Sequence, residues 1–430
     1  MTARTGRTNH TAALTNVRWI SLLPADCVHS FTRYSRFAGS TRFRLQFAHE
    51  IALPFVNRMM NTYMVACAAA MGMMTRAVDA KMTPRLTPLQ STPRLTPLCA
   101  ASLAEGLRWR KREGCLFFSD MHLGRVRTLK PDGSTTVALE VDDEPAGLGW
   151  LPDGRMLLVL MRKRLLAVKC DKEDAPSLDE VQPGIFCWAD LSHVQPVRTN
   201  DLVVDGAGNA YVGGFGLNEF WKPGNEDAQT EISLVRAADG HPQRPTPPQT
   251  AAEGLTFPNG MVISPDGKTL LVSETYGAGI VAWDRDPVDG SLSNRRCWAS
   301  LRGCFPDGMC LDAEGALWVA ICATLPANPL RSAVATVLAL VRNGFKPTGA
   351  FIRVHEGGRI SETIFLKDAM AICCMLGGPS GKTLYMSCAK ETMPEPCKAR
   401  GEQNGFIAAI EVAVPAATCA ENPDYWAGCC

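Results

Sequence analysis

The stretch FPNGMVISPDGKTLLVSETYGAGIVAWD, residues 257–284, decides the fold. Its turn PDGK, centred on Gly267, lies between an apolar run that begins with NGM and the apolar run TLLVSE. A third run, GIVAWD, follows after a short glycine-containing segment. Turn residues between two apolar runs of strand length are typical of a β-hairpin. The stretch therefore predicts three antiparallel strands joined by tight turns.

The same unit of turn and apolar run recurs along the chain. The six units are EGC–LFFSD around Gly114, PDGR–MLLVLM around Gly154, GAGN–AYVGGF around Gly208, PDGK–TLLVSE around Gly267, AEGA–LWVAI around Gly315 and PSGK–TLYMSC around Gly381. The turns are 40, 54, 59, 48 and 66 residues apart, so the loops vary in length while the hairpins stay. A third run follows in nearly every unit, namely GRVRTLK, RLLAVK, ISLVRA, GIVAWD, TVLALVR and FIAAIEV. Six such units predict an all-β protein with a six-bladed β-propeller; a β-sandwich is the alternative, but it has less need of six similar hairpins.

Residues 1–98 differ from the rest of the chain. They hold 12 basic and three acidic residues, whereas the remaining chain holds 32 basic and 40 acidic ones. An Arg-rich, Ser/Thr-rich segment that is poor in acid is typical of an organelle transit peptide. The repeat TPRLTPL at 83–89 and 92–98 indicates a Pro-rich linker. We expect residues 1–98 to form a poorly structured extension, either a targeting segment or disordered, and residues 99–430 to form the propeller.

Composition argues against several classes of protein. Basic and acidic residues number 44 and 43, and a nucleic-acid-binding protein usually carries a large positive excess. No uncharged apolar run reaches the roughly 20 residues that span a bilayer, so we expect no membrane partner. The 17 cysteines show no zinc-finger spacing and indicate buried thiols in a reducing compartment, with a disulfide-rich secreted fold as the alternative. We expect a cytoplasmic protein, or an organellar one if residues 1–98 act as a transit peptide; the oligomeric state is left open.

Counting back from each turn glycine finds a set of polar residues in register. The residues eight positions before the turn glycine, or nine in the first unit, are Glu105, Ala146, Asn200, Asn259, Asp307 and Cys373. Equivalent positions in a propeller lie at one height around the central channel. The four polar members, Glu105, Asn200, Asn259 and Asp307, are therefore expected to converge at one mouth of the channel.

These four side chains, called here the oxygen ring, offer only oxygen ligands. Two carboxylates and two carboxamides suit Ca²⁺, with Zn²⁺, Mn²⁺ or Mg²⁺ as the other candidates. Two carboxylates facing each other across a narrow channel would repel unless a cation lay between them. The alternative is that each residue merely caps a turn, since Asn and Asp favour turns. Four members in register favour a shared site for one divalent metal ion.

Three further features point to the same mouth. His122 follows the second strand of the first unit and is a candidate proton shuttle or substrate contact, with a structural loop residue as the alternative. Glu274 and Tyr276 follow the second strand of the fourth unit, and Glu219 is a further candidate for this rim. They are expected to line a substrate pocket or to form a polar rim. The insertion CATLPANPLRSAVA at 322–335 is a candidate lid.

Several motifs also resemble a known family. FPDGMCLDAEGALWVAI (305–321), VRTNDLVVDGAGNAYVGGFG (197–216), residues 257–284, GCLFFSDMHLGRV (114–126) and LGGPSGKTLYMSCA (376–389) resemble motifs of the SMP-30/gluconolactonase/LRE-like, or regucalcin-like, family. The resemblance runs from about residue 103 to 415 and keeps the family order of motifs. It does not cover residues 1–98.

The resemblance implies a propeller with one divalent metal in its channel and hydrolysis of sugar lactones or related esters. It implies metal ligands at Glu105, Asn259 and Asp307, Asn200 on or beside the metal, and a substrate-binding role for Arg198. Some members carry an acidic substrate contact shortly after the strand that follows Asn200. This chain has Gly216, Leu217 and Asn218 there, which argues against an aldonolactone substrate.

A hydrolytic mechanism follows from these residue types. The metal polarises the carbonyl group and activates a water molecule, and Asp307 is the candidate general base. Arg198, Asn200, His122 and Glu274 are the candidate substrate-binding residues. The alternatives are a phosphoester or organophosphate hydrolase on the same scaffold and a non-catalytic ligand-binding propeller, because fold alone does not fix chemistry.

Overall fold

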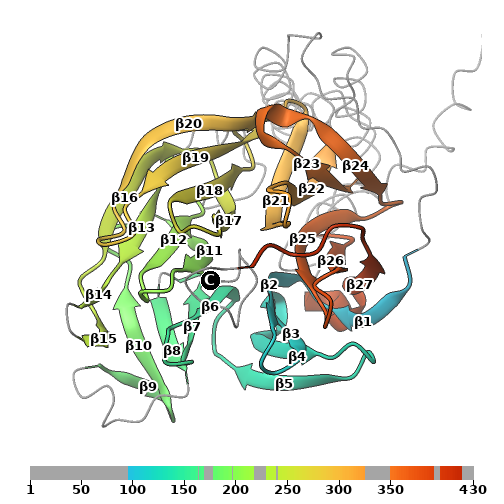
Figure 1. Ribbon diagram of the computed structural model, residues 1–430. Coiled ribbons are helices and arrows are strands. Elements are labelled where there is room, and N and C mark those ends of the chain that lie inside the picture. Colours follow the sequence, from blue (N-terminus) through green and yellow to red (C-terminus); the bar gives the residue numbers. More distant parts are fainter. Residues whose placement is uncertain are drawn as a thin grey trace, which may run out of the picture. The chain divides into compact units, whose positions relative to one another are not determined.

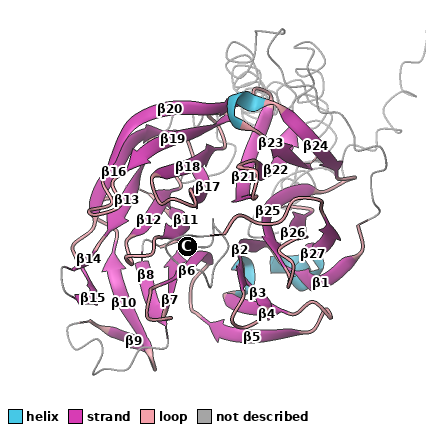
Figure 2. Cartoon of the chain, viewed as in Figure 1, coloured by secondary structure: helices cyan, strands magenta, loops and turns pink. Residues whose placement is uncertain are grey.

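The computed structural model describes residues 95–162, 164–168, 178–195, 197–216, 229–238, 241–324, 349–391 and 398–418. Most of the extension predicted over residues 1–98 lies outside them. Figure 2 shows that the described chain is mainly β-strand, with short 3₁₀ turns η4 (Met121–Leu123), η6 (Glu356–Gly358) and η7 (Gly401–Gln403) and helical residues 398–400. No helix among the described residues is long and apolar enough to cross a membrane.

Six antiparallel sheets surround a common centre (Figure 1). Their innermost strands are β2 (Ala104–Arg110), β6 (Pro145–Trp150), β11 (Thr199–Val204), β17 (Pro258–Ile263), β21 (Cys304–Leu311) and β25 (Met370–Gly377). Each innermost strand contacts that of the next sheet, and β25 contacts β2, so the six close into a ring. Every residue of β6, β11, β17, β21 and β25 is buried, as expected for strands packed between two neighbouring blades. The six-bladed β-propeller predicted from the repeats is confirmed.

The second strands match the six apolar runs that follow the turns. They are β3 (Cys115–Asp120), β7 (Met156–Leu160), β12 (Ala210–Gly214), β18 (Thr269–Glu274), β22 (Leu317–Thr324) and β26 (Thr383–Ala389). The third strands are β4 (Arg125–Leu129), β8 (Arg164–Val168), β13 (Thr230–Val235), β19 (Gly279–Arg285), β23 (Ala350–Val354) and β27 (Gly405–Glu411). Five of these third strands coincide with the predicted runs. In the fifth blade the partner of β22 is β23, not the predicted run 336–342, which lies outside the described residues.

The outer strands account for the uneven spacing of the repeats. They are β5 (Thr135–Glu140), β10 (Ile185–Asp190), β16 (Gln249–Leu255), β20 (Leu292–Ser300), β24 (Ile360–Phe365) and β1 (Pro97–Ala101). The second blade adds β9 (Glu180–Gln182), and a small hairpin of β14 (Ala237–Ala238) and β15 (His241–Pro245) lies between β13 and β16 in sequence. These additions occupy the intervals of 54 and 59 residues, whereas the longest interval, of 66 residues, includes positions 325–348, which lie outside the described residues.

The ring is closed by the beginning of the described chain. Strand β1 pairs with β27 and completes the sixth blade, which otherwise consists of the last three strands. Within the described residues, the first strand of the propeller is therefore β1, which begins at Pro97. The corner after β1 is held by Asp120, whose Oδ1 accepts a hydrogen bond of 2.8 Å from the Ser102 nitrogen and whose Oδ2 pairs with Arg127 Nη1 at 2.9 Å. Closure thus depends on contacts between residues about 300 positions apart as well as on local ones.

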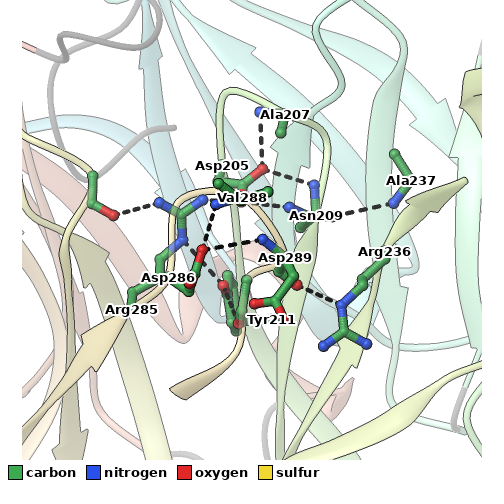
Figure 3. Close-up of polar contacts among 12 residues, drawn as sticks. Asp205, Ala207, Asn209, Tyr211, Arg236, Ala237, Arg285, Asp286, Val288 and Asp289 are labelled. Atoms are coloured by element: carbon green, nitrogen blue, oxygen red, sulfur yellow. Dashed lines mark hydrogen bonds and ion pairs between the residues drawn. The ribbon is translucent and has the colours of Figure 1, made fainter. Parts of the chain in front are cut away.

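A buried polar network ties the third blade to the fourth (Figure 3). Arg285, at the end of β19, forms an ion pair with Asp205, and neither side chain is exposed. Arg285 Nε also donates a hydrogen bond of 3.0 Å to the Tyr211 hydroxyl, which donates in turn to the Gly290 carbonyl oxygen at 2.7 Å. Asp205 follows the end of β11, whereas Asn200 lies at its beginning. The network therefore stabilises the end of the blades remote from the oxygen ring.

Candidate active site

The oxygen ring lies where the innermost strands lose register with their neighbours. All six strands have such a shift near their beginning, and in β11, β17 and β21 the dipeptides skipped by the ladder are Asn200-Asp201, Asn259-Gly260 and Asp307-Gly308. In β2, Glu105 is the last paired residue before the shift. A β-bulge re-aims side chains and is common beside active sites. The repeated bulge explains why equivalent positions can present polar groups to the channel instead of to the blade.

The four residues of the oxygen ring line one cavity of about 70 Å³. Arg198 and His122 line the same cavity, so six of the seven residues expected to bind metal or substrate lie together, and Glu274 is the exception. Ala146 and Cys373 occupy the two remaining equivalent positions and do not line it. The four polar residues found by counting back from the turn glycines thus lie around one cavity.

Of the two ring carboxylates Asp307 is buried and Glu105 is half-buried, and they repel one another. Burial raises the pKa of Glu105 well above its ordinary value, and the charges of Asp307 and Asp201 raise it further. Burial and the charge of Asp201 likewise raise the pKa of Asp307. Asp307 Oδ1 is buried and has no hydrogen-bond partner among the described residues. A buried anionic oxygen without a partner is costly, and a cation is the partner that would satisfy it.

The donor set fits a hard divalent cation. Asn200 Nδ2 donates to the Pro258 carbonyl oxygen at 3.4 Å, and Asn259 Nδ2 donates to Thr275 Oγ1 at 3.3 Å. With both amide nitrogens committed, the carboxamide oxygens are the atoms available to a cation. The described residues contain no group of three or more His, Cys, Asp or Glu side chains that could hold a metal, so a cation here depends on the carboxamides as well. Oxygen-only donors are the preferred ligands of Ca²⁺ and Mg²⁺.

An ion pair beneath the ring was not predicted from the sequence. Arg108 of β2 reaches past the second blade to Asp201 of β11, with 3.2 Å between Arg108 Nη2 and Asp201 Oδ1 and 2.7 Å from Nη2 to the Leu202 carbonyl oxygen. The path crosses Gly147, where an added methyl group would lie 2.5 Å from Asp201 Oδ1. Burial raises the pKa of Asp201, and Arg108 opposes that rise. The sequence does mark Asp201 as unusual, since NDL carries Asp where EGL, AGL, NGM and DGM carry Gly.

A second polar group, made of His122, Glu144 and Arg198 and called here the polar wall, forms one side of the cavity. His122 Nδ1 lies 3.2 Å from Glu144 Oε1, and Arg198 Nη1 lies 3.6 Å from Glu144 Oε2. The hydrogen bond with His122 lowers the pKa of Glu144, so Glu144 is an anion that orients the imidazole. His122 Nε2 is buried and has no hydrogen-bond partner among the described residues. The ring nitrogen that Glu144 does not engage is therefore left for a ligand.

Aromatic side chains form another wall, which the sequence analysis identified only at Tyr276. The Phe215 and Phe257 rings meet edge to face with centroids 4.4 Å apart, and the Phe257 and Tyr276 centroids are 5.5 Å apart. All three residues line the cavity, and we call them the aromatic wall. They come from the third and fourth blades, whereas His122 and Glu144 come from the first and second. The cavity therefore has a polar side and an aromatic side above the oxygen ring.

Glu274 is not brought to this cavity. Its Oε1 accepts a hydrogen bond of 3.0 Å from the Thr256 nitrogen, and its Oε2 pairs with Arg295 Nη2 at 2.9 Å. The neighbouring Ser273 hydroxyl points to the fifth blade and donates to the Asp307 carbonyl oxygen of β21 at 2.7 Å. Successive residues of a strand point to opposite faces, so Glu274 faces away. Glu219 and residues 325–335 of the expected lid lie outside the described residues.

Cys322 lines the cavity beside the ring and was expected only as a buried thiol. Its Sγ donates to the Phe305 carbonyl oxygen at 3.3 Å. Burial and the charge of Asp307 raise the pKa of the Cys322 thiol. The thiol therefore stays neutral and adds no negative charge to the site.

The chain belongs to the SMP-30/gluconolactonase/LRE-like family. The family model described as SMP-30/Gluconolactonase/LRE-like region matches residues 103–390. Regucalcin of Xenopus laevis is 34% identical over 314 residues, which are 71% of this chain and 89% of that protein. Regucalcin of Danio rerio is 27% identical over 220 residues, which are 49% of this chain and 61% of that protein.

Solved structures of the family share the fold. A calcium-binding protein, regucalcin, from Agrobacterium tumefaciens is 18% identical with a TM-score of 0.53, covering 75% of this chain and 94% of that one. A gluconolactonase from Xanthomonas campestris is 20% identical with a TM-score of 0.50, covering 76% of this chain and 98% of that one. At these identities the likeness concerns the propeller and not its chemistry.

Proposed function

We propose that this protein is a divalent-metal-dependent hydrolase that opens lactones or related carboxylic esters in the mouth of the propeller channel. One observation carries the proposal: the oxygen ring, Arg198 and His122 line a single cavity in which Asp307 Oδ1 has no partner among the described residues. Membership of a family that includes gluconolactonases supports the reaction class. The calcium-binding relative supports Ca²⁺ as the first candidate, ahead of Zn²⁺, Mn²⁺ or Mg²⁺.

Glu105, Asn200, Asn259 and Asp307 would hold the cation. When bound, such a cation supplies a Lewis acid that polarises the carbonyl group and lowers the pKa of water. Glu105 contributes charge, while Asn200 and Asn259 contribute neutral oxygens, so the two carboxylates of the ring match the charge of one divalent ion. The buried walls exclude bulk water and strengthen these electrostatic interactions.

The chain's own residues perform the proton transfers. Asp307 accepts a proton from the attacking water while the oxygen of that water forms a bond to the carbonyl carbon. The bond between that carbon and the ester oxygen then breaks, and the departing oxygen takes a proton from His122 Nε2, which donates as the imidazolium while Nδ1–H bonds to Glu144. Arg198, held near Glu144, donates hydrogen bonds to the oxyanion or to a substrate carboxylate. The products are the hydroxy acid or, from an open ester, an acid and an alcohol.

The test is metal-dependent hydrolysis by the full chain. Metal is stripped with a chelator, single divalent metals are added back, and acid release is followed from lactones, open esters and a phosphotriester. We expect lactone or ester hydrolysis to return with metal and to be lost in Asp307→Ala. The matched control is Asp266→Asn in an exposed turn, where Asp266 Oδ1 accepts from the Ser264 hydroxyl at 2.6 Å, and it should keep full activity. Metal-restored turnover of the phosphotriester alone would replace the proposed reaction with the phosphoester alternative.

A further inference from the structure

We propose that the substrate carries an apolar aliphatic or aromatic substituent and that the site disfavours polyhydroxylated sugar lactones. This inference rests on the proposed lactone or ester hydrolysis and names its substrate class. It comes from the unequal distribution of polar and apolar groups around the cavity. The oxygen ring receives the reacting carboxyl group, the polar wall its departing oxygen, and the aromatic wall the rest of the molecule.

The apolar lining is extensive. Besides the aromatic wall of Phe215, Phe257 and Tyr276, the cavity is lined by Leu103, Met121, Met161 and Met370. Methionine side chains adapt to irregular apolar ligands, and aromatic faces bind both alkyl chains and rings. Phe215 and Phe257 are almost fully buried, with 4% and 6% of their surface exposed. The small part of each ring that stays accessible belongs to the lining of the cavity, so a ligand there meets apolar surface.

The aromatic wall is held in place by its own supports. Phe257 has a positive φ of 56°, a conformation that a bulky residue rarely adopts. The Thr275 nitrogen donates to the Phe257 carbonyl oxygen at 3.0 Å, and Glu274 accepts from the nitrogen of the preceding Thr256 at 3.0 Å. Non-glycine residues with strained backbone cluster at functional sites, where the surrounding structure fixes them. Glu274 is thus a positioning residue that holds the turn presenting Phe257, which gives it a role other than the direct contact expected from sequence.

Among the residues that the structure describes, polar partners for sugar hydroxyls are scarce on this side. Thr275 Oγ1 already donates to the Pro306 carbonyl oxygen at 2.8 Å and accepts from Asn259. Among the described residues that form the aromatic wall, Tyr276 alone has a polar side-chain atom. A buried hydroxyl without a partner lowers affinity about fivefold or more, whereas each buried methylene raises it about fourfold. A lactone with several hydroxyl groups should therefore bind more weakly than one with an alkyl chain, because its hydroxyls lack partners and it buries fewer methylenes.

The test compares lactones of the same ring size, using the metal-loaded full chain. We expect kcat/KM for δ-decalactone to exceed that for glucono-δ-lactone at least about thirtyfold, and to rise about fourfold per methylene from δ-hexalactone until the wall is covered. Tyr276→Asn is expected to reduce the ratio of the δ-decalactone to the δ-hexalactone value about fivefold. The control is Phe117→Leu, because Phe117 packs on Trp150 with ring centroids 5.3 Å apart and does not line the cavity; the ratio should stay unchanged.

A binding measurement separates this inference from the proposed reaction. Calorimetric titration with δ-decanolactam and with gluconolactam, which resist hydrolysis, should show at least tenfold tighter binding of the alkyl compound. Hydrolysis with preference for glucono-δ-lactone, or tighter binding of gluconolactam, would overturn the inference and leave the proposed reaction standing. Absence of all lactone and ester turnover together with tight δ-decanolactam binding would overturn the reaction and retain the apolar site. Binding of neither lactam would overturn the inference.

Discussion

Replacing Asp307 by Asn should stabilise the metal-free protein and abolish its stabilisation by metal. Asn has nearly the shape of Asp but carries no charge. Asp307 is buried, its Oδ1 has no partner among the described residues, and Glu105 and Asp201 add like charge nearby. An uncompensated buried charge costs about 3 kcal/mol, and removal of this one should recover about 2 kcal/mol, because the new amide also needs partners. For a domain of roughly 320 residues, about 2 kcal/mol corresponds to a Tm about 3 °C higher.

Metal should reverse this order of stability. A cation at one hundred times its Kd stabilises the wild-type chain by about 2.7 kcal/mol, or about 4 °C in Tm, and should leave Asp307→Asn unmoved. Thermal unfolding of both full-length proteins, with chelator and with excess Ca²⁺, measures all four values. The conclusion that Asp307 carries a buried charge which a bound cation neutralises would be refuted by either of two results. The variant could be less stable than wild type in chelator, or Ca²⁺ could raise its Tm as much as that of wild type.

The stability difference between Asp307→Asn and wild type should also depend on pH, in a direction that the pKa of Asp307 determines. Because the folded pKa of Asp307 lies above the ordinary value of 3.8, its contribution to stability is fully present below that pH and is lost as pH rises toward the folded pKa. In chelator, the advantage of Asp307→Asn should therefore grow as pH rises above about 4, by no more than about 1.4 kcal/mol per pH unit. A constant or shrinking advantage would contradict the assignment. Asp266→Asn should instead be less stable than wild type by an amount that is constant above about pH 4 and disappears as pH falls further, since hydrogen bonds with Ser264 and Lys268 lower the pKa of Asp266.

Three further predictions follow from packing and from the two buried polar groups. Gly147→Ala places a methyl group 2.5 Å from Asp201 Oδ1, so the variant should lose about 2 kcal/mol of unfolding free energy in urea and part of its metal affinity; an unchanged midpoint would refute this path of the buried ion pair. Glu144→Gln removes the anion that orients His122, so kcat should fall about tenfold for alkyl esters and less for nitrophenyl esters, whose leaving group needs no proton; equal losses would contradict proton donation at this wall. Arg285→Met leaves a buried carboxylate unpaired far from the site, so it should cost about 3–5 kcal/mol in chemical denaturation while calcium affinity per folded molecule stays unchanged. Loss of calcium affinity there would show that the remote network also shapes the oxygen ring.

The repeat pattern was enough to predict the blades and to group the site residues. Both predictions depend on the number of residues between each ring position and the following turn glycine. This number is nearly constant because it corresponds to the length of an innermost strand. That interval is local, so it is conserved within the chain even where the loops differ in length. It grouped Glu105, Asn200, Asn259 and Asp307, which come from four different blades.

The pattern fails where partners are distant in the chain or where two apolar runs compete. Arg108 pairs with Asp201, 93 residues away, and nothing in either local sequence names the other. The closing strand β1 pairs with β27 across about 300 residues. In the fifth blade, two runs of strand length follow β22, and only the pairing partners show that the later one, β23, belongs to the sheet. Glu274 was misjudged because the pattern placed it at the rim without fixing which way its side chain points.

The most direct test of the oxygen ring is calorimetric titration of the chelator-treated full chain with Ca²⁺. We predict one calcium site per chain, which is lost in Asp307→Asn and in Glu105→Gln but retained in the exposed-turn control Asp266→Asn. Absence of binding, or a site that survives in both ring variants, would contradict a cation held by these four side chains.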